Sequence, residues 1–562
     1  MGGIAMRKGW LFGLAMLVAV GLAILATTPP APLRDSAPPA VFSAARAMHD
    51  VRIIASGPHV TGTAQSLQVI DIITKRMTDL GMEVSTSQGT IDARGTAKRN
   101  SWTGRADPPA TLTNLIGILP GKDRNLPAVL LMAHHDTVWG SPGAADDTAG
   151  VAAALEVIRA LRIHGPPQRD LVLLLTDGEE LGLQGARQFF AQAPLRFHVG
   201  AVINMEARGG GGRTTLFQTS RQNGAAVRLY ADAVRRPGAS SLSAFVYSVL
   251  PNDTDLTPVI QGPYVAYNFA FIGRPGLYHS PKATPERLDQ GSLQDMGGQV
   301  LDLTRALLSA PQLPAKAADA VFFDAFGLTT ITYPVWLGWI MLALSLGGFG
   351  LVLRRDGTAG LGSGAGRMAG LLTLAGVLLF ALNRLSLGLG PSNYYDRLAA
   401  IPRLEVIAAL ACAAAYLLAF GAWKPPRGAI VGAALPLLVL GAVAQFAAPT
   451  AAYVIVLPVL LVALGLCVPG EWSKSAVAAL VVGYMVGLGH QLMQGVGPTM
   501  PMAAALPLGL AGLALLPLWP GLSQRNARAA AVGLLVAATA VALWVQLDAP
   551  ADTRAIYSDG KT

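Results

Sequence analysis

Residues 130–138 read LLMAHHDTV, and residues 143–150 read GAADDTAG. The apolar run at 128–133 predicts a strand buried on both faces, and the residue types at 146–148 are those that cap a helix. Strand and helix patterns alternate around this stretch, which is typical of an α/β domain with a mostly parallel central sheet flanked by helices. We expect strands at 112–119, 128–133, 171–176 and 199–205, and helices at 65–80 and 150–163.

The composition indicates that much of the chain lies in lipid. Of its 562 residues, 52% are hydrophobic and only 13% are charged, whereas soluble domains carry about 25% charged residues. Both cysteines, Cys412 and Cys467, lie in apolar stretches, so the polar part can hold neither a disulfide nor a cysteine metal site. The net charge is +9, but the basic residues flank apolar segments, which indicates a lipid bilayer rather than nucleic acid as partner.

Apolar segments occupy the start and the second half of the chain. The run at 10–26 follows Arg7 and Lys8, as in a signal peptide or an uncleaved anchor, and its poor cleavage site favours an anchor. Eight later segments each approach the roughly 20 residues that cross a bilayer. These segments lie at 335–353, 368–387, 404–422, 428–446, 451–468, 475–494, 502–519 and 529–547.

Basic residues in the loops between these segments favour alternate sides. The positive-inside rule then places the N-terminus in the cytoplasm and the globular part outside it. We therefore expect a multi-pass integral membrane protein, which in a bacterium would lie in the plasma (inner) membrane with the globular domain on the periplasmic side. The expected parts are an N-terminal membrane anchor (1–27), an exported globular domain (28–330), an all-α polytopic membrane domain of about eight transmembrane helices (331–550) and a polar tail (551–562).

Five places in the globular part carry histidine or acidic residues that could bind a metal, four of them directly after predicted strands. In an open α/β sheet such positions meet in the crevice beyond the carboxyl ends of the strands. Each place alone has a plain explanation, such as helix capping or a solvated loop, but carboxylates gathered at one edge repel one another unless a cation neutralises them. The five places are LLMAHHDTV with His134, His135 and Asp136; GAADDTAG with Asp146 and Asp147; LLLTDGEELG (173–182) with Asp177, Glu179 and Glu180; VINMEARGG (202–210) with Glu206; and GLYHS (276–280) with His279.

Zinc chemistry fits these residue types. Imidazole and carboxylate ligands suit zinc, although cobalt and manganese accept the same donors. Two zinc ions about 3.5–4 Å apart can together activate a water molecule and polarise a carbonyl group. Such a centre needs a bridging carboxylate, a histidine and a carboxylate for each ion, and an uncoordinated carboxylate as general base. The five places supply these groups.

The motifs, taken in order, resemble those of metallopeptidase family twenty-eight. The resemblance extends from PHVTGT (58–63) to TPERLD (284–289) and covers most of the globular part. The family includes di-zinc aminopeptidases, glutamate carboxypeptidases and glutaminyl cyclases. The anchor, the multispanning tail and PNDTDL (251–256) are similar to its endoplasmic reticulum metallopeptidase branch. The resemblance implies a zinc-exopeptidase-like fold.

The resemblance also implies two zinc ions per chain. In that arrangement Asp146 bridges the ions, Glu206 joins His134 on one of them, and Glu180 joins His279 on the other. Glutamate at position 206 replaces the aspartate of the best-known aminopeptidases, which leaves the substrate preference open. Family members often have aspartate at the position of Ala283, so the sequence leaves the partner of His279 open as well.

Three further residues receive roles from the resemblance. Glu179 would be the catalytic base that takes a proton from water, and Asp136 would orient His134. Asp255 would line the substrate site. In a carboxypeptidase, Arg208 or Arg213 would meet the substrate carboxylate.

The expected function is therefore zinc-dependent exopeptidase activity, of the aminopeptidase type, on peptide substrates. A glutaminyl cyclase and a carboxypeptidase of the same family remain alternatives. A peptide-binding transporter or receptor without catalysis is a further alternative, although a binding module needs no residue such as Glu179. No feature identifies a partner protein.

Overall fold

The computed structural model describes residues 2–390 and 392–558. Met1 of the expected anchor and residues 559–562 of the expected polar tail lie outside the described residues. The chain divides into two compact units. One comprises Met1–Thr27, Tyr333–Ser392 and Ala400–Ala549, and the other comprises Thr28–Thr332, Asn393–Ala399 and Pro550–Thr562.

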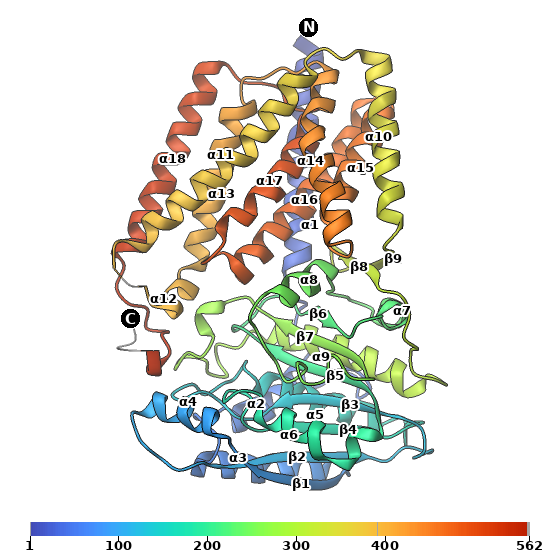
Figure 1. Cartoon of the computed structure of the whole chain (residues 1–562), viewed down its shortest axis with the longest axis vertical. Helices are drawn as coiled ribbons and strands as arrows, with labels where there is room; N and C mark the ends of the chain where they lie inside the picture. The colour runs from blue at the N-terminus through green and yellow to red at the C-terminus, as the bar shows by residue number, and fades with distance from the viewer. Residues whose placement is uncertain (1, 391, 559–562) are drawn as a thin grey trace. The chain divides into compact units, whose positions relative to one another are not determined.

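A seven-stranded mixed sheet forms the centre of the second unit, in the order β1-β2-β4-β3-β5-β7-β6 (Figure 1). The four central strands β4, β3, β5 and β7 run parallel to one another. The outer strands β1, β2 and β6 pair antiparallel. The strands are β1 (Glu83–Thr90), β2 (Thr111–Leu119), β3 (Ala128–His134), β4 (Leu171–Thr176), β5 (Val199–Ala207), β6 (Thr215–Thr219) and β7 (Val265–Phe271).

Helices cover both faces of this sheet, and the central strands are therefore buried on both sides. Alternate residues of β3, such as Leu131, belong to the hydrophobic core beneath α2, α3, α5 and α9. The intervening residues, such as Leu130, pack in a second core with Phe189 of α6. These helices are α2 (Ala44–Ile54), α3 (Ala64–Asp79), α5 (Thr148–Arg162), α6 (Gln184–Gln192) and α9 (Gln290–Ser309).

The α/β class expected from the sequence is confirmed, with parallel pairing limited to the central strands. The four expected strands correspond to β2, β3, β4 and β5, and the two expected helices correspond to α3 and α5. Strands β1, β6 and β7 were not predicted. β1 has the polar sequence EVSTSQGT and lies at an edge of the sheet. None of its residues is fully buried, so its sequence shows no apolar pattern that would identify a strand.

The first unit is helical and contains the apolar segments. Within the described residues, seven of its helices are long and apolar enough to cross a membrane. The expected segments 451–468 and 502–519 coincide with shorter apolar helices, Tyr453–Cys467 and Pro501–Leu515. The seven longer helices are α1 (Gly2–Thr27), α10 (Leu337–Asp356), α11 (Leu361–Leu387), α13 (Ile401–Phe420), α14 (Arg427–Ala447), α16 (Glu471–Val496) and α18 (Gln524–Leu547).

Candidate metal centre

The candidate ligands come from the carboxyl ends of the parallel strands. His134 is the last residue of β3, and Glu206 is the next-to-last residue of β5. Glu180 lies in the turn that follows β4, and His279 follows β7 after a short 3₁₀ turn, Pro275–Leu277. Asp146 precedes α5 in the connection that leaves β3. Parallel pairing places these chain ends at one edge of the sheet, as expected for a site in an α/β fold.

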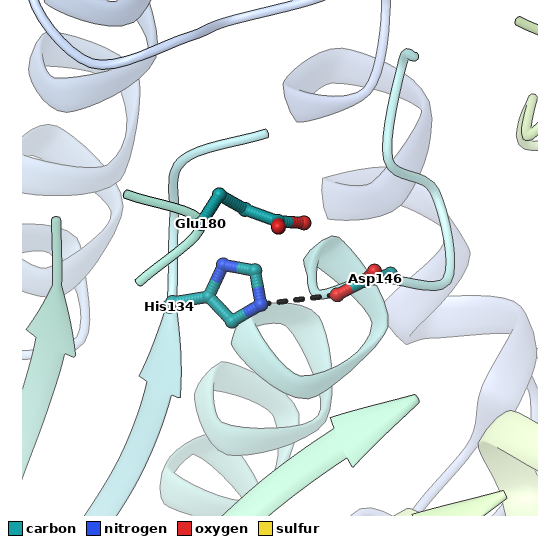
Figure 2. A group of neighbouring side chains, drawn as sticks. All are labelled: His134, Asp146 and Glu180. Atoms are coloured by element: carbon teal, nitrogen blue, oxygen red, sulfur yellow. Dashed lines mark hydrogen bonds and ion pairs between the residues drawn. The ribbon is translucent and has the colours of Figure 1, made fainter. Parts of the chain in front are cut away.

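Asp146 lies between two histidine rings. Its Oδ1 is 3.0 Å from Nε2 of His134, and its Oδ2 is 3.4 Å from Nε2 of His279. Figure 2 shows the first of these contacts, with Glu180 beside the same pair of residues. Each oxygen of the carboxylate therefore faces a different imidazole nitrogen, which is the arrangement needed for one carboxylate to bridge two cations.

Each histidine also has its own glutamate. Oε1 of Glu206 is 3.8 Å from Nε2 of His134, and Oε1 of Glu180 is 3.1 Å from Nε2 of His279. One possible donor atom each from His134, Asp146 and Glu180 lie within 4.8 Å of one another. The five side chains thus form two sets of imidazole and glutamate that share Asp146.

The buried polar atoms of this cluster fit a zinc centre. Nε2 of His279 is buried and points at carboxylate oxygens, yet it forms no hydrogen bond with any residue in the described ranges. Three carboxylates, from Asp146, Glu180 and Glu206, gather around the two rings with little exposure to solvent. A cation would accept the free nitrogen lone pair and neutralise the carboxylates, and zinc takes this combination of nitrogen and oxygen donors.

Burial and neighbouring charge shift the ionisation of the acidic residues. Burial raises the pKa of Glu206 to about 7, and the negative charge of Asp146 adds to this effect. Burial also raises the pKa of Glu179 well above its usual value, with further contributions from the carboxylates of Glu206, Glu180 and Asp255. A carboxylate with a raised pKa is a stronger base near neutral pH than an exposed one, which suits Glu179 to proton transfer.

Asp136 connects the end of β3 with the turn after β4. Its Oδ1 accepts the backbone N–H of Glu179 at 3.0 Å, and its Oδ2 accepts that of Glu180 at 3.3 Å. The ring of His134 donates from Nδ1 to the backbone carbonyl of Asp136 at 3.0 Å, and Oδ1 of the same residue lies 3.5 Å from Nδ1. Asp136 therefore fixes both the ring of His134 and the backbone that carries the two glutamates.

The neighbours His135 and Asp147 have other partners. Nε2 of His135 contacts the carbonyl oxygen of Thr113 at 2.9 Å. Asp147 is the N-cap of α5, where its side chain accepts the backbone N–H of Gly150 at 3.1 Å. It also accepts the backbone N–H of His134 at 3.3 Å. His135 is thereby connected to β2, and Asp147 connects the start of α5 to the end of β3.

The three candidate substrate-binding residues lie in different surroundings. Asp255 is buried and accepts a hydrogen bond from the hydroxyl of Thr176, and burial raises its pKa to about 6. Its Oδ1 has no hydrogen-bond partner within the described part of the chain. The guanidinium of Arg208 donates to the hydroxyl of Tyr394. Arg213 pairs with buried Asp295, at 2.6 Å from Nε to Oδ2.

Four residues beside this cluster were not singled out from the sequence. His59 is buried and its backbone N–H donates to the hydroxyl of Thr137, and its position in PHVTGT was a signal for it. The ring of Tyr278 stacks on His279 with centroids 3.7 Å apart. The hydroxyls of Tyr395 and Tyr557 contact Nδ1 of His279. No local motif pointed to these two tyrosines, because each is far from His279 in the sequence.

Residues 114–304 match peptidase family M28. These residues contain every candidate ligand. This stretch of the chain is therefore similar to the peptidases of family M28. The M28 match includes the strands β3, β4, β5 and β7 and the helix α5, so it covers the part of the fold that positions the cluster.

A metallopeptidase of the endoplasmic reticulum and a vacuolar membrane protease are among the curated relatives of the chain. It is 31% identical over 310 residues to endoplasmic reticulum metallopeptidase 1 of Rattus norvegicus, covering 51% of this chain and 34% of the relative. It is 31% identical over 274 residues to the vacuolar membrane protease of Yarrowia lipolytica, covering 46% of this chain and 27% of the relative. The chain thus spans about a third of the length of these relatives.

Solved structures similar to the chain include a zinc aminopeptidase from Bacillus subtilis, with 15% identity and a TM-score of 0.38 over 49% of this chain and 98% of the other. Fimbriiglobus ruber glutaminyl cyclase aligns with 18% identity and a TM-score of 0.37, over 50% of this chain and 99% of the other.

Proposed function

We propose that this chain is a zinc-dependent aminopeptidase with two zinc ions in its M28 domain. The observation that carries the proposal is the position of Asp146 between His134 and His279, each of which has its own glutamate. His134, Asp146 and Glu206 would hold one ion, and Asp146, Glu180 and His279 would hold the other. When bound, zinc supplies Lewis-acid polarisation of a peptide carbonyl and acidifies water.

Glu179 would act as the general base. Its carboxylate accepts a proton from the attacking water as the new carbon–oxygen bond forms at the peptide carbonyl. The same carboxyl group then returns the proton to the departing nitrogen as the carbon–nitrogen bond breaks. The raised pKa of Glu179 and the hydrogen bond from its backbone N–H to Asp136 support this role, because they supply a basic carboxylate on a fixed backbone.

The charge of the cluster favours a substrate with a free amine. The two zinc ions would offset the charges of their ligands Asp146, Glu180 and Glu206, but Glu179 and Asp255 are neighbouring acidic groups outside the proposed ligand set. A substrate ammonium is attracted to such surroundings, whereas a substrate carboxylate is repelled. Arg213 is engaged with Asp295, which argues against its use as a carboxylate receptor. These observations favour an aminopeptidase over a carboxypeptidase.

The proposed location is a membrane, with the M28 domain on the side away from the cytoplasm. The apolar helices of the first unit support membrane insertion. The distribution of basic residues supports the orientation, which in a bacterium corresponds to the periplasmic side of the plasma membrane. Peptides outside the cytoplasm would then be the substrates.

The test uses the full chain, purified in detergent. Zinc content per chain is measured, and hydrolysis is followed with peptides that carry a free or an acetylated amine. Glu179→Gln removes the base and keeps the side-chain shape. Glu286→Gln is the matched control, because Glu286 is exposed. Loss of a general base typically costs about 10²–10⁴-fold in rate, so Glu179→Gln should show a kcat reduced by that factor with unchanged zinc content.

Each outcome distinguishes among the candidate functions. Cleavage of free-amine peptides alone, with about two zinc ions per chain, supports the aminopeptidase. Turnover of Glu179→Gln at the wild-type rate would overturn the proposed mechanism. Cleavage of acetylated peptides from their carboxyl end would indicate a carboxypeptidase. Cyclisation of N-terminal glutamine with release of ammonia would indicate a glutaminyl cyclase.

A further inference from the structure

Two segments outside the M28 match belong to the same compact unit as the metal centre. The helix α12 (Tyr394–Ala399) lies in the connection between α11 and α13, and residues 550–558 follow α18. Both segments group with residues Thr28–Thr332 rather than with the membrane helices that flank them in the sequence. The connections of the membrane helices therefore contribute to the unit that contains the candidate ligands.

Each of these segments brings a tyrosine hydroxyl to His279. Nδ1 of His279 is 2.6 Å from the hydroxyl of Tyr557 and 3.0 Å from that of Tyr395, and the two hydroxyls contact each other. The opposite nitrogen, Nε2, faces Glu180 at 3.1 Å and Asp146 at 3.4 Å. The imidazole thus has its metal-facing nitrogen on one side and two hydroxyls on the other.

The backbone conformation at His279 is unfavourable for this residue type and depends on the side-chain contacts of the ring. Its φ angle is +58°, in the left-handed region that residues other than glycine seldom adopt. A conformation of this kind persists where the surrounding structure holds it. Tyr278 stacks on one face of the ring, and the two hydroxyls fix the direction of Nδ1.

Several contacts fix the two segments to each other and to the rest of the unit. Between the segments, Arg554 pairs with Asp396 at 2.6 Å. Asn393 Nδ2 donates to the hydroxyl of Ser558 at 3.0 Å. The position of the two hydroxyls is thus part of an extended set of contacts.

Contacts with the globular part hold Tyr557 in place. The ring of Tyr557 packs against Trp102 of α4 (Ala93–Thr103), with centroids 5.3 Å apart. It lies at the margin of a small hydrophobic core that includes Val138, close to the loop that carries Asp136. Lys282 pairs with Asp552 in the same segment. A substitution that removes only the hydroxyl of Tyr557 leaves these contacts in place.

An imidazole that binds a metal through Nε2 carries its proton on Nδ1. The partner of that N–H fixes the tautomer and the ring orientation and so tunes the affinity for the metal. We propose that Tyr557 and Tyr395 are positioning residues that orient His279 toward a metal ion through its Nδ1. Residues from the connections of the membrane helices then complete the metal centre of the M28 domain. This inference rests on the proposed zinc centre.

The test compares zinc affinity in full-length variants purified in detergent. Tyr557→Phe, Tyr395→Phe and the double variant remove the hydroxyls and keep the rings. Tyr394→Phe is the matched control for metal affinity, because its hydroxyl contacts Arg208 rather than His279. Each protein is titrated with a series of chelators, its cobalt-substituted form is examined by visible absorption, and its Tm is recorded.

The expected result is a weaker affinity for one of the two ions. Removal of a hydrogen-bond partner of a metal ligand typically costs about 10–100-fold in affinity, so the double variant should lose that factor at the ion held by His279. Its cobalt spectrum should change, while Tyr394→Phe should match the wild type. Wild-type affinity for both ions in the double variant would overturn the inference, and so would a lower Tm with unchanged affinity.

Failure of this inference differs from failure of the proposed function. If the wild-type chain binds no zinc in the titration, the proposed zinc centre is wrong and the role of the tyrosines falls with it. If the wild type binds two ions and the double variant binds them equally well, the centre stands and only the role of Tyr557 and Tyr395 is refuted.

Discussion

The buried ion pair between Arg213 and Asp295 allows a quantitative test of which arginine could recognise a substrate. Nε of Arg213 lies 2.6 Å from Oδ2 of Asp295, and the two side chains are 4% and 1% exposed. The same carboxylate oxygen accepts the backbone N–H of Thr214 at 3.0 Å, and Nη2 of Arg213 donates to the carbonyl of Pro237 at 2.9 Å. Both charged groups are therefore buried and already bonded to partners within the domain.

Asp295→Asn removes the hydrogen-bonded counter-charge of the buried guanidinium of Arg213 and leaves only the more distant carboxylate of Asp324 near it. Breaking a buried pair in this way costs about 3–5 kcal/mol of unfolding free energy. At roughly 2–4 °C per kcal/mol for a domain of this size, the Tm should fall by about 6–20 °C. When Asp295→Asn is combined with Arg213→Met, neither position of the pair carries a charge, and the amide oxygen introduced at position 295 can still accept the N–H of Thr214. More than half of the loss should therefore be recovered in the double variant.

Thermal unfolding in detergent, followed by intrinsic fluorescence, measures the stability. Below the transition, the KM of Arg213→Met should match the wild type for peptides with free and with amidated carboxyl ends. The reasoning would be refuted by an unchanged Tm in Asp295→Asn. It would also be refuted if Arg213→Met raised KM about tenfold for free-carboxylate peptides alone, a loss of about 1.4 kcal/mol in binding.

Two further predictions concern proton and metal linkage. Burial lowers the pKa of His59 to about 4, below the unfolded value near 6.5. Between these pH values the unfolded state binds one more proton than the folded state. The free energy of unfolding therefore decreases as the pH falls from about 6.5 to about 4. The Tm of the wild type should therefore drop more steeply over this range than that of His59→Asn, and parallel curves would contradict the assignment. Removal of metal by a chelator should lower the Tm, because Asp146, Glu180 and Glu206 then face one another without a cation. Readdition of zinc at about 100 times its dissociation constant should restore about 2.7 kcal/mol of unfolding free energy. An equal Tm with and without chelator would argue against a structural contribution from the metal.

The sequence predicted the central strands because their burial leaves a direct pattern. β3 and β4 are buried along their whole length, so each appears as a continuous apolar run. β7 is equally buried but contains Asn268, whose side chain is satisfied by Asn204, Gln218 and Thr254. A buried polar residue with partners so distant in the sequence breaks the pattern that identifies a strand.

The candidate ligands could be predicted for the same reason that the strands could. His134 and Glu206 stand at or next to the ends of predicted strands and Glu180 follows one directly, so local sequence places these three at the edge of the sheet. Their roles as metal ligands remain predictions. The surroundings of His279 could not be predicted, because Tyr395 lies 116 residues away in the chain and Tyr557 lies 278 residues away. Contacts over such separations depend on the tertiary fold and have no local pattern.

The long separation between His279 and Tyr557 also has a consequence for biosynthesis. The strands that carry the candidate ligands leave the ribosome first, and Tyr557 is made 278 residues after His279. At about 5–20 residues per second, translation of this interval takes on the order of 15–55 s. The membrane helices from α10 to α18 are synthesised during that time. The hydroxyl of Tyr557 reaches His279 only afterwards, so the contacts around Nδ1 of His279 are complete only once these helices have been made.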